Sequence, residues 1–441
     1  MKIAGIIAEF NPFHNGHKRL LSLARTQAGA DFVVVILSGN FVQRGVPAFM
    51  EKRFRTQAAL ENGADIVLEL PVRYATGSAP VFARGAIAGL LSLGCTSQLV
   101  FGSETRLEIL SLLASLECSM ETSMDFSLYV KEQSRKGLSY PKIRQEYLLS
   151  RLPEDMEKES CKEALKSPNS ILGIEYLKAL SFFDRSLDLH AIPRNDAGYH
   201  STDENVFCSA ASLRRQFLSS SFPKEGLPEN CISMLEAEYQ KSFPILPSDF
   251  DLLLYDRLLS WEMNPQSTFQ DIDPDSRDRL LNHIRQYEGY ESFAALCSQK
   301  QKTVTRTFRM LSHLLLRIPQ FYPEPFSKEC SSQKDGRPPS GRFSTGSDHY
   351  HDPQSRKNRP GLWIPYLRLL GMKKEASLCL KKASVPVVTK LAAAGSLFPD
   401  KKLPAMLQED ILASRLYQQA VRSRYKTSLT DEYRTSPLIL P

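Results

Sequence analysis

The stretch Lys2–Leu23, KIAGIIAEFNPFHNGHKRLLSL, decides the fold of this chain. It begins with a continuous apolar run, Ile3–Ala8, which predicts a short strand buried on both faces of a sheet. After a polar turn around Asn11 and Pro12, leucines return at helical spacing and predict a helix. The sequence therefore predicts a strand–turn–helix unit at the amino end.

The turn of this unit carries two histidines, His14 and His17, in the pattern H-x-G-H. A helix start exposes unpaired N–H groups and the positive end of the helix dipole, so it attracts phosphate. Residues three apart lie on one side of the first turn, where both imidazoles can reach one anion. Gly16 leaves room for a nucleotide beside the backbone. We interpret the two histidines as candidate catalytic residues. On the motif alone, a surface loop with two incidental histidines stays open as an alternative.

Placed between a first strand and a first helix, the H-x-G-H motif resembles that of the HxGH nucleotidyl-transferase superfamily. The resemblance implies that a nucleophile attacks the α-phosphate of ATP and pyrophosphate leaves. Imidazoles and helix N–H groups would then stabilise the charge on the phosphoryl oxygens without covalent catalysis. The sequence has neither a Walker A motif nor G-x-G-x-x-G, so neither a P-loop nor a dinucleotide fold is supported.

Composition indicates a soluble globular protein of more than one domain. The chain has 441 residues, of which 42% are hydrophobic and 24% charged. No run of about twenty apolar residues predicts a membrane span, and no secretory signal is recognised. The eight cysteines are scattered without a C-x-x-C pair. They indicate reduced thiols in the cytoplasm and argue against a cysteine-based zinc site, and we predict no protein-bound metal.

Charge is distributed unevenly along the chain. Residues 281–441 contain 26 Lys and Arg against 13 Asp and Glu, whereas residues 1–280 contain 30 against 36. The basic second part indicates contact with a polyanion such as nucleic acid. A solvated basic surface without a partner is the alternative. Near the carboxyl end, four cations are candidate contacts to a phosphate backbone: Arg415, Arg422, Arg424 and Lys426.

Further apolar runs alternate with helical patterns through the first half of the chain. Strands are predicted at 32–37, 66–70, 99–101 and 187–192, with helices near 51–62, 79–93 and 171–183. This alternation is typical of a parallel sheet with right-handed crossovers, in which ligands bind beyond the carboxyl ends of the strands. Residues 119–167 read as a charged helical insertion. After Phe217 the pattern is mainly helical, and 331–360 is too poor in aliphatic residues to form a core.

Six strings together carry a closer resemblance. They are AEFNPFHNGH, LSGNFVQRG, GADIVLELP, FGSE, PNSILGIEYLKAL and R-x-x-AGYH. They resemble the bacterial tRNA(Met) cytidine acetate ligase family over most of residues 1–215, and more thinly beyond. The resemblance implies a Rossmann-like α/β, parallel-sheet HxGH nucleotidyltransferase domain over 1–215. A mainly α-helical, basic, tRNA-binding domain over 216–441, with a disordered insertion at 331–360, would follow.

The resemblance also implies an activity and its partners. Acetate is activated with ATP, and we expect Mg²⁺ with it, to acetyl-adenylate, and the acetyl group is transferred to the wobble cytidine of elongator tRNA(Met). The implied nucleotide-binding residues are Ile7, Ala8, Glu9, Phe10, Asn11, Pro12, Phe13, His14, Asn15, Gly16, His17, Lys18, Arg19, Leu20, Gly102, Asn169 and Arg194. Nothing in the sequence predicts an oligomeric state.

Two motifs depart from the family pattern. The superfamily's S-S-T-x-I-R is here SAASLR, residues 209–214, which keeps Ser209 and Arg214 but lacks two hydroxyls. The family's PNN is here Pro168-Asn169-Ser170. Two other functions stay open at this point. One is a nucleotidyltransferase that acts on a phosphorylated small molecule, and the other is a non-catalytic RNA-binding protein that senses nucleotide.

Overall fold

The computed structural model describes residues 1–121, 123–138, 140–154, 156–194, 209–219, 222–299, 303–320 and 363–441. The predicted insertion at 331–360 and the AGYH string lie outside these residues. Among the described residues, no helix is both long and apolar enough to cross a bilayer.

A parallel sheet forms the centre of the molecule. Its strands are β1 (Ile3–Ala8), β2 (Phe32–Ser38), β5 (Ile66–Leu70), β6 (Gln98–Ser103) and β7 (Asp188–Pro193), in the spatial order β5-β2-β1-β6-β7. Each neighbouring pair is parallel. The predicted α/β fold, with its strands at the predicted positions, is therefore confirmed.

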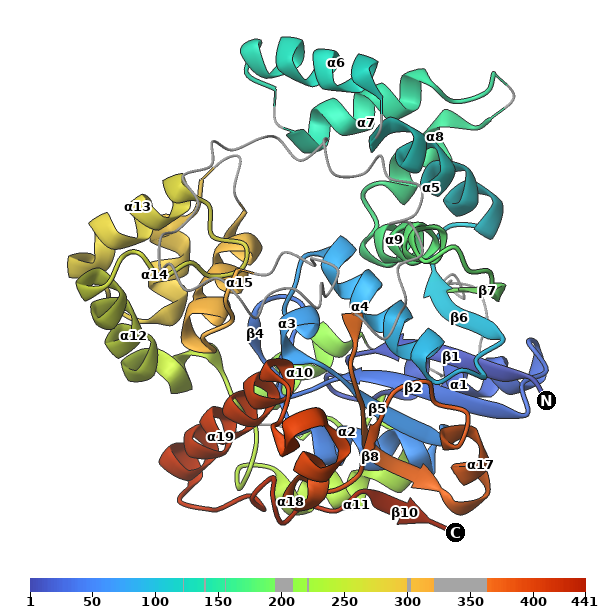
Figure 1. Ribbon diagram of the computed structural model, residues 1–441, viewed down its shortest axis with the longest axis vertical. Coiled ribbons are helices and arrows are strands. Elements are labelled where there is room, and N and C mark those ends of the chain that lie inside the picture. The colour runs from blue at the N-terminus through green and yellow to red at the C-terminus, as the bar shows by residue number, and fades with distance from the viewer. Residues whose placement is uncertain are drawn as a thin grey trace.

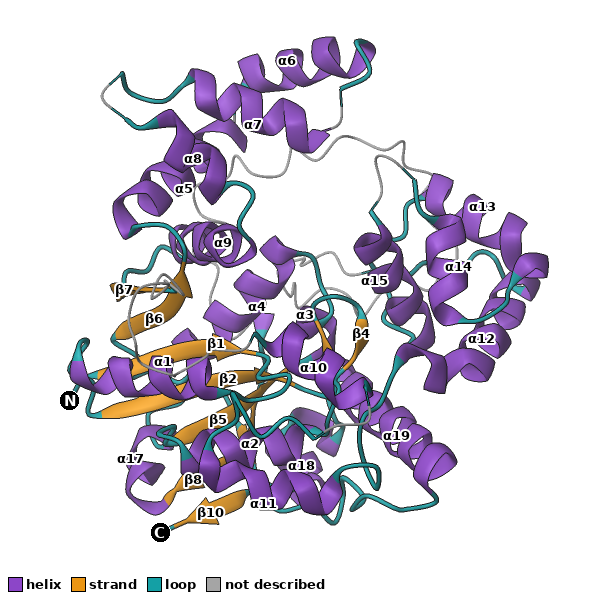
Figure 2. Cartoon of the chain, turned by 180° about the vertical axis from the view of Figure 1, so that it is seen from behind, coloured by secondary structure: helices purple, strands orange, loops and turns teal. Residues whose placement is uncertain are grey.

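Helices cover both faces of the sheet because the strands bury side chains on both sides. In β2, Val33 and Val35 belong to one core and Val34 and Ile36 to the other. Helices α1 (Asn15–Thr26) and α2 (Lys52–Glu61) pack on the first core, and α4 (Ala79–Ser92) and α9 (Pro168–Phe182) on the second. Figure 1 shows α4 in front of the sheet and α9 end-on above β6 and β7, and Figure 2 shows α1 across β1 and β2 from behind.

The end of the chain returns to this sheet. Strand β8 (Leu367–Lys373) pairs antiparallel with β5, and β9 (Val387–Val388) and β10 (Leu438–Leu440) pair parallel with β8. None of these three strands was predicted from the sequence; β9 and β10 have only two and three residues, whereas β8 has seven. The domain boundary at residue 215 stays a prediction, but the sheet contains strands from both sides of that boundary.

The expected helices of the second part gather beside the sheet. They are α10 (Ala210–Leu218), α11 (Glu229–Glu238), α12 (Asp251–Met263), α13 (Pro274–His283), α14 (Tyr290–Cys297), α15 (Val304–Leu315), α17 (Ser377–Leu380), α18 (Leu391–Ala394) and α19 (Ala405–Tyr425). A third core joins α12–α15 to α19.

The predicted charged insertion is helical as well. It contains α6 (Met124–Arg135), α7 (Tyr140–Ser150) and α8 (Lys158–Ala164), which follow α5 (Leu107–Glu121), while α3 (Val72–Ala75) lies beside α4. Figure 1 shows α6 and α7 projecting from the rest of the molecule. A small core of their own holds these two helices together.

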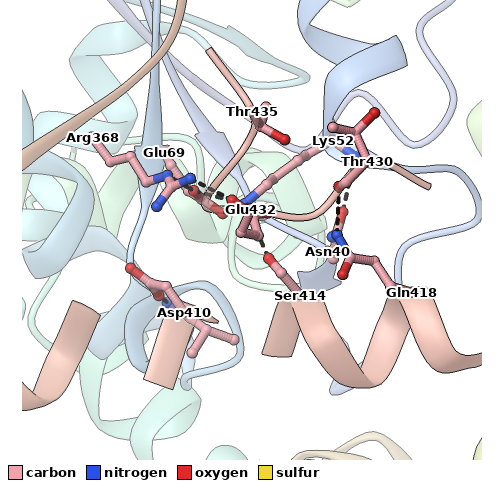
Figure 3. A network of polar contacts seen from close by, with 12 residues as sticks. Asn40, Lys52, Glu69, Arg368, Asp410, Ser414, Gln418, Thr430, Glu432 and Thr435 are labelled. Atoms are coloured by element: carbon pink, nitrogen blue, oxygen red, sulfur yellow. Dashed lines mark hydrogen bonds and ion pairs between the residues drawn. The ribbon is translucent and has the colours of Figure 1, made fainter. Parts of the chain in front are cut away.

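A buried ionic network fastens the returning segment to the sheet (Figure 3). Lys52 Nζ lies 2.7 and 2.9 Å from the two carboxylate oxygens of Glu69 and 2.7 Å from Glu432. Arg368 pairs with the same two carboxylates, at 3.1 Å from Glu69. Two cations and two anions from α2, β5, β8 and the terminal segment therefore neutralise one another while buried.

Removing one member of this network should lower the stability of the fold. We predict that Lys52→Met lowers the free energy of unfolding by about 3–5 kcal/mol, because it leaves two buried carboxylates facing one guanidinium. Urea denaturation of the full chain measures this change. Lys136→Met, which removes an exposed i,i+4 pair with Glu132, is the matched control and should change nothing measurable. Equal stability of Lys52→Met and the unaltered chain would contradict the role of the network.

Candidate functional site

A cavity of about 320 Å³ lies beyond the carboxyl ends of β1, β6 and β7. Most of the predicted nucleotide-binding residues line it: Ile7, Ala8, Glu9, Phe10, Asn11, His14, Gly16, His17, Arg19, Leu20, Gly102, Asn169 and Arg194. Four do not: Pro12, Phe13, Asn15 and Lys18. Phe13 is buried in the core, and Lys18 is exposed on α1. The ATP-binding role of these residues stays a prediction.

His14 is the N-cap of α1. Its Nδ1 accepts a hydrogen bond of 3.0 Å from the Gly16 backbone N–H, and its own backbone N–H donates to His17 Nδ1 at 3.3 Å. The two rings are stacked, with their centroids 3.6 Å apart. A Cβ added at Gly16 would lie 2.9 Å from the His14 ring, so the glycine gives this ring the space it needs to cap the helix.

Burial sets the charge of both imidazoles, and these hydrogen bonds set their tautomers. Burial, and then the charge of Arg194, lower the pKa of His14 to about 4. Burial, His14 and Arg194 lower the pKa of His17 as well. Both rings are therefore neutral at pH 7, and because each Nδ1 accepts a backbone N–H, each carries its proton on Nε2. The pair presents two N–H donors to an anion without itself titrating near neutrality.

The start of α1 differs from the expectation in one respect. Its first N–H groups already have partners: Asn15 donates to the Gly226 carbonyl at 2.9 Å, Gly16 to His14 Nδ1, and His17 to the His14 carbonyl at 2.8 Å. The expectation that these N–H groups are unpaired is therefore wrong for this structure, and phosphate binding at the turn stays a prediction. The positive end of the helix dipole and the imidazole Nε2–H groups are the other features of this turn that suit an anion.

Two aromatic rings pack against the His17 ring. Phe10 lies 4.8 Å and Phe13 5.7 Å, centroid to centroid, from the His17 ring. Phe10 has a positive φ of 47°, a backbone conformation that costs about 1–2 kcal/mol for a residue with a side chain. Its nearly complete burial holds it there. The turn is therefore shaped by core packing, to which Phe13 contributes although it does not line the cavity.

Another part of the cavity wall joins the end of β6 to the first turn of α9. Ser170 Oγ lies 2.9 Å from Thr105 Oγ1 and 3.3 Å from Ser103 Oγ, and Asn169 donates to Glu104. These bonds bring Gly102 and Asn169 together in the wall of the cavity, and their role in nucleotide binding stays a prediction.

Gly102 makes room for Arg194. A Cβ added at Gly102 would lie 3.0 Å from Cγ and Cδ of Arg194, so the glycine lets the arginine cross the strand end. The Arg194 backbone N–H donates to the Ser103 carbonyl at 3.0 Å. The side chain of Arg194 is exposed and lines the cavity on the side of the histidines, whose pKa values its charge lowers.

The cavity has further polar residues that the predicted nucleotide site omitted, namely Gln43, Arg44, Ser209 and Arg214. Arg214 Nη1 donates to the Asn11 carbonyl at 2.6 Å. The strings SGNFVQRG and SAASLR contain these residues, but spacing alone does not show that both strings reach one cavity.

A buried guanidinium fixes the strand ends below the cavity. Arg55 is fully buried and donates to the carbonyl groups of Glu9 at 2.7 Å, Ser38 at 2.9 Å and Met50 at 3.0 Å, and to that of Gly39. Burial lowers the pKa of Arg55 to about 10, so it stays charged at neutral pH. One side chain of α2 thus ties the ends of β1 and β2 together.

No group of three metal-ligating side chains occurs among the described residues. Of the described residues that line the cavity, Glu9 is the one with a carboxyl group, and burial raises its pKa. None of the six described cysteines forms a disulfide: Cys95, Cys118, Cys161, Cys231, Cys297 and Cys379.

A doubly covered parallel sheet with a histidine-capped first helix at its cavity is the arrangement of a HIGH nucleotidyl transferase. The family model described as HIGH Nucleotidyl Transferase matches residues 1–334. A Bacillus velezensis protein named tRNA(Met) cytidine acetate ligase is 31% identical, over 99% of this chain and 97% of its own length.

Two solved structures are similar over the full chain. Thermotoga maritima TmcAL in its apo form superposes with a TM-score of 0.80 at 25% identity, covering 100% of both chains. The same protein bound with alpha-thio ATP gives a TM-score of 0.79 at 24% identity, covering 100% of this chain and 99% of that one. The chain belongs to the tRNA(Met) cytidine acetate ligase family within the HIGH nucleotidyl transferases.

The low pKa of His14 has a consequence for stability. An unfolded histidine titrates near pH 6.5 and folded His14 near 4, so between these values the unfolded state binds more protons. Stability should fall as the pH is lowered through this window, by up to about 3 kcal/mol from His14.

Urea denaturation of the ligand-free chain at pH 7, 6, 5 and 4 measures this slope. His14→Asn keeps an N-cap acceptor but does not titrate, and should flatten the slope. Identical slopes in the two proteins would show that His14 does not carry the shift.

Proposed function

We propose that the chain is an ATP-dependent ligase that activates acetate as acetyl-adenylate and acetylates the wobble cytidine of elongator tRNA(Met). The products would be acetylcytidine, AMP and pyrophosphate. Family membership over the full length supports the proposal. The observation that carries it is the neutral, stacked pair of His14 and His17, whose Nε2–H donors belong to a cavity of suitable size for a nucleotide.

In the first step a carboxylate oxygen attacks the α-phosphorus, and the bond to the pyrophosphate oxygen breaks. No proton is taken up or released, so the site needs charge stabilisation and no general base. Two fixed Nε2–H donors and the Arg194 guanidinium supply it, and the helix dipole adds to their field. Because the donors are already held by backbone hydrogen bonds, little reorganisation accompanies the reaction.

In the second step the exocyclic amine of cytidine attacks the acetyl carbonyl, AMP leaves, and the amine loses one proton. The mixed anhydride is already an activated acyl donor, so no covalent enzyme intermediate is required. Holding the anhydride and the amine together replaces a bimolecular encounter, which lowers the barrier. The protein's role in this step is positioning.

Magnesium would enter as the MgATP substrate. The described residues around the cavity provide one carboxyl group, Glu9, which is too few for a protein cage around a divalent ion. Magnesium bound to nucleotides usually takes phosphate and water oxygens and few protein ligands. We assign no step to it. With free thiols and a tRNA substrate, the cytoplasm is the proposed location.

Helix α19 is the proposed contact to the tRNA backbone. Arg415 and Arg422 are exposed, and neither has a carboxylate partner within the described residues. Arg424 differs, because it forms a 2.9 Å ion pair with Asp249. The free cations at 415 and 422 are therefore the better candidates for phosphate contacts.

A transferase acting on a phosphorylated small molecule is one of the two other functions that the sequence left open. No observation on the structure favours it, and the full-length match to the ligase family speaks against it. The deciding experiment incubates the chain with tRNA, ATP and ¹³C-labelled acetate, followed by mass spectrometry of the tRNA nucleosides. Labelled acetylcytidine supports the proposal, and its absence under conditions of ATP turnover contradicts it.

We predict that His14→Ala and His17→Ala each reduce acetate-dependent exchange of pyrophosphate into ATP by about a hundredfold or more, since each removes a donor to the developing charge. Binding of tRNA, measured by filter retention, should be unchanged. Exchange near the level of the unaltered chain in both variants would overturn the assignment of these residues.

We predict that Arg415→Ala with Arg422→Ala weakens tRNA binding and lowers the salt slope of log K by about one unit per arginine. Affinity measured at several salt concentrations tests this. Arg424→Ala is the matched control on the same helix and should have a smaller effect, because Asp249 already neutralises it. A slope that does not change in the double variant would exclude this patch.

A further inference from the structure

The cavity contains a second group of cations apart from the histidines. Arg44 and Arg214 both line it, and Arg44 forms no ion pair with any described residue. After burial, the charge of Arg194 contributes to the lowered pKa values of His14 and His17. Burial, and then the charge of Arg44, lower the pKa of Arg214. Burial raises the pKa of Glu9, and the charge of Arg44 partly opposes that rise. We call Arg44 and Arg214 the arginine corner of the cavity, and His14, His17 and Arg194 the histidine corner.

Arg44 is held on a rigid turn. The hairpin of β3 (Phe41–Val42) and β4 (Val46–Pro47) closes with a hydrogen bond of 2.8 Å from the Gly45 N–H to the Val42 carbonyl. Gly45 has a φ of +71°, and a Cβ there would lie 2.3 Å from the backbone nitrogen of Arg309 in α15. Ser312 Oγ of the same helix donates to the Gly45 carbonyl at 2.9 Å.

The other side of the turn is tied to β1. The Gln43 backbone N–H donates to Glu9 Oε1 at 2.9 Å, and Arg214 is fixed by its bond to the Asn11 carbonyl. Around Glu9 stand three guanidinium groups, those of Arg44, Arg55 and Arg214. One carboxyl group cannot neutralise three cations, so this corner keeps a positive charge and attracts an anion.

We propose that Arg44 and Arg214 form the subsite that binds the carboxylate substrate and directs its oxygen toward the α-phosphate. This inference rests on the proposed function and deepens it. Two planar, permanently charged guanidinium groups suit a carboxylate, whose two oxygens each accept hydrogen bonds. The first step joins two anions that repel each other. The cations of the arginine corner would offset this repulsion for the smaller anion, while the histidine corner would bind the triphosphate.

The same cations have two other possible ligands, a phosphate of ATP and a phosphodiester of tRNA. The kinetic constants separate them. For Arg44→Met and Arg214→Met, we expect the KM for acetate in pyrophosphate–ATP exchange without tRNA to rise about tenfold or more, with the KM for ATP within twofold. Arg44→Lys should fall between Arg44→Met and the unaltered chain, because it keeps the charge and loses the planar fork.

A second measurement does not depend on turnover. Line broadening of ¹³C-acetate in NMR spectra reports acetate binding to the full chain loaded with α,β-methylene ATP. We expect it in the unaltered chain and not in Arg44→Met. Arg106→Met is the control, because Arg106 is exposed, lies outside the cavity wall and should leave both readouts unchanged. Arg44 makes no bond to the core, so its variants test the subsite even if Arg214→Met fails to fold.

The outcomes are distinct. An unchanged KM for acetate in Arg44→Met, or a KM for ATP that rises as much, overturns the carboxylate subsite, the latter in favour of a phosphate contact. A defect seen only in the KM for tRNA overturns it in favour of the phosphodiester. Acetate binding by the unaltered chain without acetyl transfer to tRNA would contradict the proposed function and leave the subsite supported.

Discussion

The hydrogen bond from the Gly16 N–H to His14 Nδ1 is the constraint on which the site depends. It closes the turn after β1, caps α1 and sets the tautomer of the first imidazole. The matching bond to His17 Nδ1 sets the second. The motif H-x-G-H thus shapes the turn and also supplies the imidazole N–H donors. The first histidine needs the glycine for space, and the second histidine needs the first to hold its ring.

Below this turn, buried charges keep the strand ends together. Arg55 donates to carbonyl groups at the ends of β1 and β2, and Lys52, one turn earlier in α2, joins Glu69 of β5 to Glu432. Such groups are costly to bury without partners, so they specify which segments must meet. The cavity is positioned by this frame, and its loops add the residues that face a ligand.

Much of this could be predicted from the sequence. The strands are continuous apolar runs, and such runs identify a buried parallel strand with little ambiguity. Ile3–Ala8 and Ile66–Leu70 have the predicted bounds. The residues of the first turn were predicted from a motif whose chemistry is local. The returning strands were not, since the pairing of LRLLGMK with β5, and the ion pairs of Arg368 with Glu69 and Glu432, join segments that are remote in sequence.

The cavity wall shows the same limit. Arg44 and Arg214 are 170 residues apart, and no local pattern indicates that a hairpin turn and a helix start will face one another. The expectation that the first N–H groups of α1 are unpaired is wrong for a related reason. Whether such groups are unpaired depends on Gly226, a residue remote from the turn that happens to accept the Asn15 N–H.

The late return of the chain to its own sheet has a consequence during synthesis. Before residues 367–373 have been synthesised, β5 is an unprotected sheet edge, and Lys52 and Glu69 lack Arg368, while Glu432, which completes their neutral set, comes still later in the chain. The frame under the nucleotide cavity is therefore complete only after residue 432 has been synthesised. A nascent or prematurely terminated product would carry the whole H-x-G-H turn and still lack the support that keeps that turn in shape.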